Sequence, residues 1–325
     1  MALSPATQVP ARSAPGSLED EVADRYLDLM KSCLTRYLFI DEEPHTLRLG
    51  WTESIGLLKR VLGPRGVRMV KHLAKPVVVG SSNGEPQAAR LPAAARRTGS
   101  GSRVQLVKFG GRRAHREVGC DWPPFAETMV GLRRLENVQQ CVRDVIRQQV
   151  PGDILEAGVW RGGTAIFMRA VLAAHGDASR RVWVADSFQG LPMPDAEKYP
   201  EDAERDLWIY PELAVGLEAV KANFARYGLL DDRVEFLPGW FKDTLPSAPI
   251  ERLAVLRLDG DLYESTMDAL SALYPKVSPG GYVIVDDYGC LEACKRAVDD
   301  YRAAHGITDE IREVDWTGAY WQRTS

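Results

Sequence analysis

The second half of the chain alternates short apolar runs with segments of helical periodicity. The apolar runs end in turns and are too short for helices, so they predict strands at residues 153–158, 181–186, 233–237, 253–259 and 281–286. Helical segments separate them, at about 162–176, 212–227, 265–274 and 290–305, and two last strands are expected at 309–315 and 319–323. Strands that alternate with crossover helices form parallel sheets covered on both faces. The pattern therefore predicts an α/β fold with a doubly wound, mostly parallel sheet of seven strands.

The N-terminal part of the sequence is less regular. From this change of pattern we expect the chain to divide into three parts. Residues 1–18 are rich in Pro, Ala and Ser, which is typical of a disordered tail. Residues 19–125 are expected to hold an amphipathic helix at 19–40, a second helix within 51–75, and a variable insertion of linker composition with a short strand at 103–109. The α/β domain is expected at 126–325, beginning with a strongly periodic helix at about 126–149.

Composition and charge exclude some classes of protein. Of the 325 residues 45% are hydrophobic and 26% charged, as in globular proteins, and no apolar run approaches the roughly 18–20 residues of a membrane span. The first residues lack the apolar core of a secretory signal, and the five cysteines form no CxxC, so we expect a cytoplasmic chain. Between Lys59 and Arg116 there are 14 Lys/Arg and one acid, Glu85. Because only one aromatic residue, Phe109, is interleaved, we interpret this stretch as a solvated insertion and expect no nucleic-acid binding.

Ligands of doubly wound sheets bind beyond the carboxyl ends of the strands. After the first strand, Glu156 and Ala157 lead through Gly158, Gly162 and Gly163 into a helix, a turn whose backbone can approach a ligand closely. The spacing is not GxGxxG and there is no P-loop lysine, so these glycines can equally serve helix packing. An acid at the position of Glu156 argues against a pyrophosphate and suits a ligand with a cationic end.

The second and third strands suggest an adenosine-type cofactor. Asp186, followed by Ser187 and Phe188, stands where an acid can accept hydrogen bonds from ribose hydroxyls, although it could also cap the next helix. Gly239 and Trp240, after the third strand, could form an adenine-facing wall or belong to the core. S-adenosylmethionine fits this combination better than NAD because no phosphate cradle is evident.

Paired acids follow the fourth and fifth strands. Asp259 and Asp261 end one strand, Asp286 and Asp287 the other, and neighbouring parallel strands bring their carboxyl ends together. Crowded carboxylates raise one another's pKa, and a hard cation such as Mg²⁺ relieves the repulsion. We assign Asp259, Asp286 and Asp287 as metal ligands and Asp261 as the base that deprotonates a hydroxyl for methyl transfer. The alternative is that some of these acids only cap helices.

Long segments in the same order resemble the macrocin O-methyltransferase family. They include DILEAGVWRGG from residue 153, LAVLRLDGDLYESTMDAL from residue 253 and SPGGYVIVDDYG from residue 278. The resemblance implies a class I S-adenosylmethionine-dependent methyltransferase with an N-terminal lid, Mg²⁺, the same aspartate roles, and homo-oligomers that methylate a sugar hydroxyl of a macrolide or similar antibiotic. It further implies cofactor contacts at Ala157, where the family usually has Thr, at Asp259, and at Glu136 and Asn137.

Two other functions remain open. A catechol-type O-methyltransferase acting on an aromatic diol also places a metal at these strand ends, but the comparison of families implies a lysine near the position of Asp261. A non-catalytic protein that binds nucleic acid through the basic segment would need none of the strand-end acids. The segment 44–120 is longer and more basic than the family's, so the sequence does not identify the acceptor.

Overall fold

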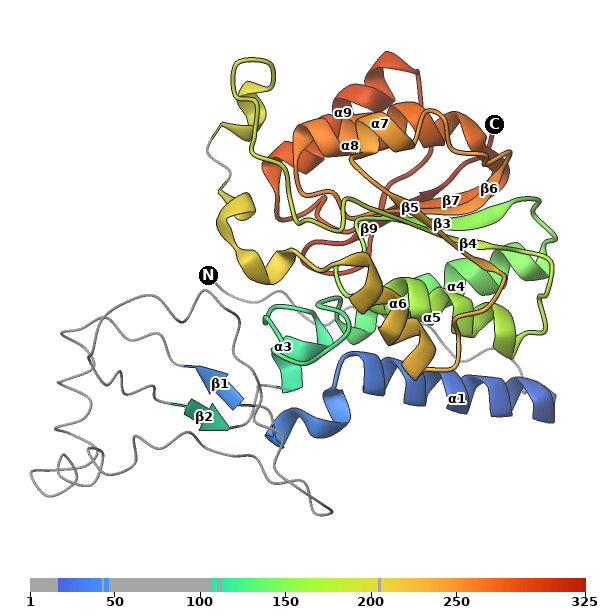
Figure 1. Ribbon diagram of the computed structural model, residues 1–325. Coiled ribbons are helices and arrows are strands. Elements are labelled where there is room, and N and C mark those ends of the chain that lie inside the picture. The colour runs from blue at the N-terminus through green and yellow to red at the C-terminus, as the bar shows by residue number, and fades with distance from the viewer. Residues whose placement is uncertain (1–16, 43, 47–106, 110–112, 204–205) are drawn as a thin grey trace, which may run out of the picture. The chain divides into compact units, whose positions relative to one another are not determined.

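The computed structural model describes residues 17–42, 44–46, 107–109, 113–203 and 206–325 (Figure 1). The described residues of 1–40 and 111–325 form one compact unit, and those of 41–110 form another. In the second unit β1 (Pro44–Thr46) pairs antiparallel with β2 (Val107–Phe109), which confirms the last three residues of the predicted strand at 103–109. The helix expected within 51–75 and most of the basic segment lie outside the described residues. The predicted three-part division of the chain stays a prediction.

The first unit contains a mixed seven-stranded sheet in the order β5-β4-β3-β6-β7-β9-β8. Its strands are β3 (Asp153–Ala157), β4 (Val182–Asp186), β5 (Val234–Pro238), β6 (Leu253–Leu258), β7 (Val277–Val285), β8 (Arg312–Glu313) and β9 (Ala319–Gln322). The first five are parallel, while β9 runs antiparallel to both β7 and β8. The prediction of a mostly parallel, seven-stranded sheet is therefore confirmed. The strand order reverses between β3 and β6, which is where such sheets bind ligands.

Helices cover both faces of this sheet (Figure 1). One face carries α4 (Leu132–Arg147), α5 (Gly163–Ala174) and α6 (Leu217–Arg226); the other carries α7 (Phe241–Thr244), α8 (Tyr263–Leu273) and α9 (Glu292–Ala304). The alternation along β3 shows the two layers, because Ile154 packs into one core cluster and Leu155 into the other. Within the described residues, no helix is both long and apolar enough to cross a bilayer.

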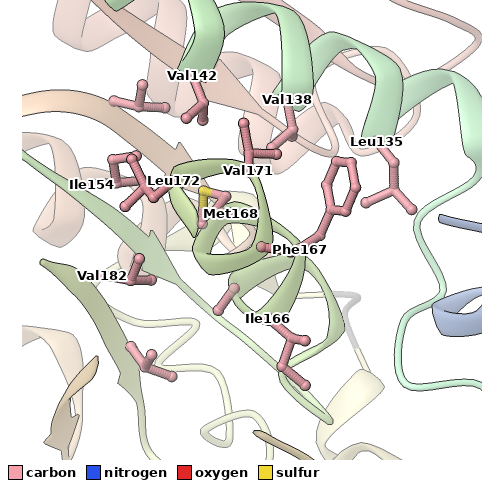
Figure 2. Packing of buried hydrophobic residues seen from close by; sticks show 14 of the residues in the cluster. Leu135, Val138, Val142, Ile154, Ile166, Phe167, Met168, Val171, Leu172 and Val182 are labelled. Carbon is pink, nitrogen blue, oxygen red and sulfur yellow. The ribbon is translucent and has the colours of Figure 1, made fainter. Parts of the chain in front are cut away.

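The core beneath β3 and β4 is built around α5, which is buried from Gly163 to Leu172. Figure 2 shows Met168, Val171 and Leu172 of this helix lying between Val138 and Val142 of α4 and the strand residues Ile154 and Val182. Helix α1 (Leu18–Leu34) packs against α5 from outside. This packing fixes the start of α5, and with it the glycine turn that follows β3.

Three predicted helices are shorter than their periodicity suggests, and one of them, expected at 212–227, begins only at Leu217. The helix expected at 19–40 ends at Leu34, since Arg36 has a left-handed φ of 53°, and a 3₁₀ helix, η1 (Tyr37–Glu42), follows. The predicted start at 126 is wrong: α4 begins at Leu132 after Gly131. Residues before it are used for tertiary bonds instead, because the Glu127 carbonyl accepts from the Gly163 amide at 2.9 Å.

Candidate active site

A cavity of about 550 Å³ opens at the carboxyl ends of β3, β4, β6 and β7. Nine of the residues predicted from the sequence line it: Glu156, Gly158, Asp186, Ser187, Trp240, Asp259, Asp261, Asp286 and Asp287. The remaining predicted residues are not among the described residues that line it: Glu136, Asn137, Ala157, Gly162, Gly163, Phe188 and Gly239. The site thus lies at the switch point of the sheet, where the strand pattern predicts it.

Three carboxylates meet in this cavity. Asp259, Asp261 and Asp287 each offer one oxygen atom, and these atoms all lie within 4.8 Å of one another. The buried Oδ2 of Asp287 has no hydrogen-bond partner among the described residues. Burial, together with the neighbouring acids, raises the pKa of Asp287 well above its usual range and that of Asp259 to about 6. Such a cluster matches the oxygen donors that a hard divalent cation requires.

Asp286 is held differently from the other strand-end acids. One of its oxygens accepts a hydrogen bond from Arg134 and the other from Arg257, and both arginines are buried. The structure therefore groups Asp259 and Asp287 with Asp261, whereas the sequence predicts a ligand set with Asp286. The physical reason is that two buried guanidinium groups draw the Asp286 carboxylate toward themselves.

Arg257 is a central residue of the site that the sequence analysis did not identify. It lies on β6 with 1% of its surface exposed, and it donates to Glu156 at 2.6 Å, to Asp259 at 2.9 Å and to Asp286. An arginine is buried this fully only when it is paired. Its place in the apolar run LAVLRL was a usable indication of buried acids nearby.

The glycine turn is required by a close approach of two strand ends. Gly158 has a φ of 85°, and a Cβ atom there would lie 1.8 Å from the carbonyl oxygen of Asp259. By contrast, a Cβ at Gly162 would meet Val220 at 2.7 Å and one at Gly163 would meet the Glu127 carbonyl at 2.5 Å. Close packing therefore requires glycine at both positions, and their predicted cofactor contacts stay a prediction. Of the three glycines only Gly158 lines the cavity, together with its neighbours Val159 and Trp160.

Glu156 lies below this turn and is also buried. One oxygen pairs with Arg257, and Oε2 has no hydrogen-bond partner in the part of the chain that the structure describes. Burial raises the pKa of Glu156 to about 8, and the attraction of Arg257 only partly opposes this shift. The site therefore contains a buried acid that can accept further donors or a positive charge.

The carboxylate of Asp186 stabilises two turns, the one that follows β3 and the one that follows β4. Its Oδ2 accepts from the Val159 amide at 2.8 Å and its Oδ1 from the Phe188 amide at 2.7 Å. An ionised carboxylate has about four acceptor positions, so it can still receive hydroxyl donors from the cavity. Phe188 itself turns into the core and packs against Phe236, with 6.4 Å between ring centroids.

The predicted contacts on α4 do not reach the cavity. Glu136 pairs with Lys31 of α1, and Asn137 is buried on the same helix. Residues 128–130, which precede α4, and Arg134 line the cavity in their place. Residues of a helix share a face only at spacings of three or four, so a shift of one or two residues moves a side chain to another face.

The cavity is also lined by apolar side chains, which no periodicity in the sequence indicated. Its walls include Leu191, Met193, Leu207 and Leu213 from the connection between β4 and α6, and Trp122 and Trp316 from elsewhere. The Trp122 ring meets the ring of Tyr210 edge-on at 5.5 Å. The cavity therefore combines clustered acids with apolar side chains that suit a large apolar group.

The model of the family Macrocin-O-methyltransferase (TylF) matches residues 23–323. The chain belongs to this family. It is similar to 8-demethyl-8-(2,3-dimethoxy-alpha-L-rhamnosyl)-tetracenomycin-C 4'-O-methyltransferase of Streptomyces olivaceus, with 62% identity over 211 residues that cover 65% of this chain and 80% of the relative. It is also similar to Mycinamicin III 3''-O-methyltransferase of Micromonospora griseorubida, with 56% identity over 213 residues, 65% of this chain and 84% of the relative.

A solved structure agrees with this membership of the macrocin O-methyltransferase family. The O-methyltransferase NovP has a TM-score of 0.72 and 44% identity, over 93% of this chain and all of that chain. The resemblance to the family and the class I methyltransferase fold are confirmed, and the chain is an O-methyltransferase. The cytoplasmic location, the homo-oligomeric state and the lack of nucleic-acid binding stay predictions.

Proposed function

We propose that this O-methyltransferase transfers a methyl group from S-adenosylmethionine to a sugar hydroxyl of a glycosylated natural product, with the help of Mg²⁺. The observation that carries the proposal is the cluster of Asp259, Asp261 and Asp287, with oxygens within 4.8 Å, in a cavity that apolar side chains also line. Two matched relatives support the acceptor class, because their names specify glycosylated or macrolide antibiotics, a rhamnosyl-tetracenomycin and mycinamicin III.

The residues present fit a divalent cation. The partnerless Oδ2 of Asp287 and the raised pKa values of Asp259 and Asp287 are what a cation would relieve. Asp259 and Asp287 would hold it, with a third oxygen from Asp261 or from Asp286. Asp286 would have to share an oxygen with one of its two arginines to take part. When bound, the cation would lower the pKa of the acceptor hydroxyl, and the sulfonium would supply the methyl group and leave as a neutral thioether.

The chain's own residues would orient the reactants and receive the proton. Asp261 would take the proton of the acceptor hydroxyl on a carboxylate oxygen, as the sequence analysis proposes. Asp186 would accept from the ribose hydroxyls, Trp240 would border the adenine, and Glu156 lies where a positively charged end could be received. Holding the reacting atoms in line would supply much of the rate enhancement.

The first experiment measures methyl transfer directly. The protein is incubated with methyl-labelled S-adenosylmethionine and either a panel of deoxysugar glycosides or a simple catechol, with and without Mg²⁺. Labelled glycoside is expected, and titration calorimetry should show that the protein binds the methyl donor. Methylation of the catechol alone would favour the aromatic-diol alternative, and transfer to neither would contradict the proposal.

A second experiment separates the two possible roles of Asp261. Mn²⁺ binding is measured by electron paramagnetic resonance for Asp261→Asn and Asp286→Asn. If Asp261 is only the base, its variant loses turnover but keeps metal affinity, and Asp286→Asn weakens the metal. If Asp261 is the third ligand, its own variant weakens the metal and Asp286→Asn does so much less.

A further inference from the structure

Helix α8, which follows the catalytic turn, receives its N-terminal cap from a distant segment. Its own N-cap residue is Leu262, a buried apolar side chain that cannot accept a hydrogen bond. The first two helical amides, of Tyr263 and Glu264, donate instead to the two carboxylate oxygens of Asp202, at 2.7 and 3.1 Å. Asp202 is 1% exposed. A buried carboxylate at a helix N-terminus satisfies free amides and interacts favourably with the helix dipole.

The cap lies directly behind the turn that carries two of the clustered acids. Asp261 precedes the first capped residue, Tyr263, by two positions and has a left-handed φ of 57°. The Leu262 amide donates to the Gly260 carbonyl at 2.6 Å, so the turn is short. At the other end, the Asp259 amide donates to the Ala157 carbonyl of β3 at 2.8 Å. The turn is therefore fixed by the sheet on one side and by Asp202 on the other.

Asp202 is itself held firmly against α8 and α9. It ends a 3₁₀ helix, η3 (Pro200–Asp202), in the connection between β4 and α6. The Tyr199 ring packs on the Tyr263 ring, with 5.9 Å between centroids, and Glu201 pairs with Arg296 of α9 at 3.2 Å. The same connection supplies apolar residues that line the cavity. Asp202 therefore links this connection to the turn that carries Asp259 and Asp261.

We propose that Asp202 is a positioning residue: through the first turn of α8 it sets the conformation of Asp259-Gly260-Asp261. This inference rests on the proposed function, because that turn carries one of the proposed metal ligands and the proposed base. A local cap would stabilise α8 alone. A cap from another segment also fixes where the helix begins, and small displacements of reacting groups are costly to catalysis.

The test compares Asp202→Ala and Asp202→Asn with Asp177→Asn as a matched control. Asp177 is also largely buried, and it accepts from the backbone amides of Ser179 and Arg180 at 2.9 and 3.2 Å. It precedes β4, at the end of the sheet opposite the cavity. Three quantities are measured below the melting temperature of every variant: kcat and KM for methyl transfer, Mn²⁺ affinity, and hydrogen exchange of the amides at 260–264.

For Asp202→Ala we expect kcat to fall about 10–100-fold with a smaller change in the KM for the methyl donor, weaker Mn²⁺ binding, and faster exchange across 260–264. Asp202→Asn keeps one acceptor oxygen, so its values should lie between those of the unaltered protein and those of Asp202→Ala. Asp177→Asn should change neither the kinetic constants, nor the Mn²⁺ affinity, nor the amide exchange. A lower melting temperature with unchanged kcat and Mn²⁺ affinity would overturn the proposal, since Asp202 would then be only a structural cap. If the unaltered protein neither binds Mn²⁺ nor transfers methyl, the proposed function fails. In that case hydrogen exchange in Asp202→Ala still tests whether Asp202 positions the turn. The positioning role is overturned if only the amides of Tyr263 and Glu264 exchange faster.

Discussion

Replacing Arg257 with methionine should destabilise the protein far more than a similar change at a partly exposed ion pair. Arg257 is 1% exposed and lies among three acids, Glu156, Asp259 and Asp286. Methionine preserves much of the volume but removes the positive charge. Breaking a buried ion pair by removing one partner costs about 3–5 kcal/mol, because the remaining charge stays buried without compensation.

The control is Arg169→Met. Arg169 pairs with Asp231 at 2.5 Å, but the Asp231 side chain is 37% exposed, so water can solvate it when its partner is lost. Pairs of this kind contribute about 0–1 kcal/mol. The two substitutions are chemically identical, so a difference of about 2–5 kcal/mol reflects the deeper burial and the larger number of acidic partners of Arg257.

The assay is urea unfolding at pH 7.5, followed by tryptophan fluorescence, with and without Mg²⁺. Arg257→Met should lower the free energy of unfolding by about 3–5 kcal/mol without metal. Mg²⁺ should restore part of the loss, since a ligand that binds only the folded state stabilises it. Equal small losses for both variants would refute the reasoning, because the clustered acids would then not carry the negative charge that the account requires.

Three further changes test other parts of the site. Burial raises the folded-state pKa of Glu156 to about 8 from 4.5, so stability should fall as pH rises through this interval, and Glu156→Gln should remove that dependence in melting curves. Gly158→Ala should lower stability by at least about 2 kcal/mol and abolish binding of the methyl donor in calorimetry, because the new Cβ would lie 1.8 Å from the Asp259 carbonyl and φ is positive. Trp122→Ala should raise the KM for the acceptor and leave the Kd of the methyl donor unchanged, since this ring is one of the apolar side chains that line the cavity. Unchanged melting curves, normal donor binding or an unchanged acceptor KM, respectively, would contradict these expectations.

The strands and the position of the site could be predicted because local sequence determines them. A short apolar run between turns has few alternatives to a buried strand, and five such runs separated by helices fix a parallel sheet. Acids directly after two of these runs, such as Asp259 and Asp287, must then lie at one edge of the sheet. The start of α4 could not be predicted, since residues 126–131 carry helical periodicity but make their bonds to other segments.

The finer arrangement of the site depends on contacts between distant residues. Asp286 looks like Asp287 in the sequence, but only the fold brings Arg134 and Arg257 to its two oxygens. The cap of α8 comes from Asp202, 61 residues before Tyr263. No pattern along the chain encodes such pairs, although an arginine inside an apolar run and a helix with leucine at its N-cap both indicate that a partner is missing locally.

The most direct measurement is the methyl-transfer rate of the protein after treatment with excess chelator, before and after Mg²⁺ is added back. We predict that chelation abolishes transfer to the glycoside, that Mg²⁺ restores it, and that Asp287→Asn shows no restoration at the same concentration. Full activity in excess chelator would contradict the claim that these carboxylates share a cation that holds the acceptor.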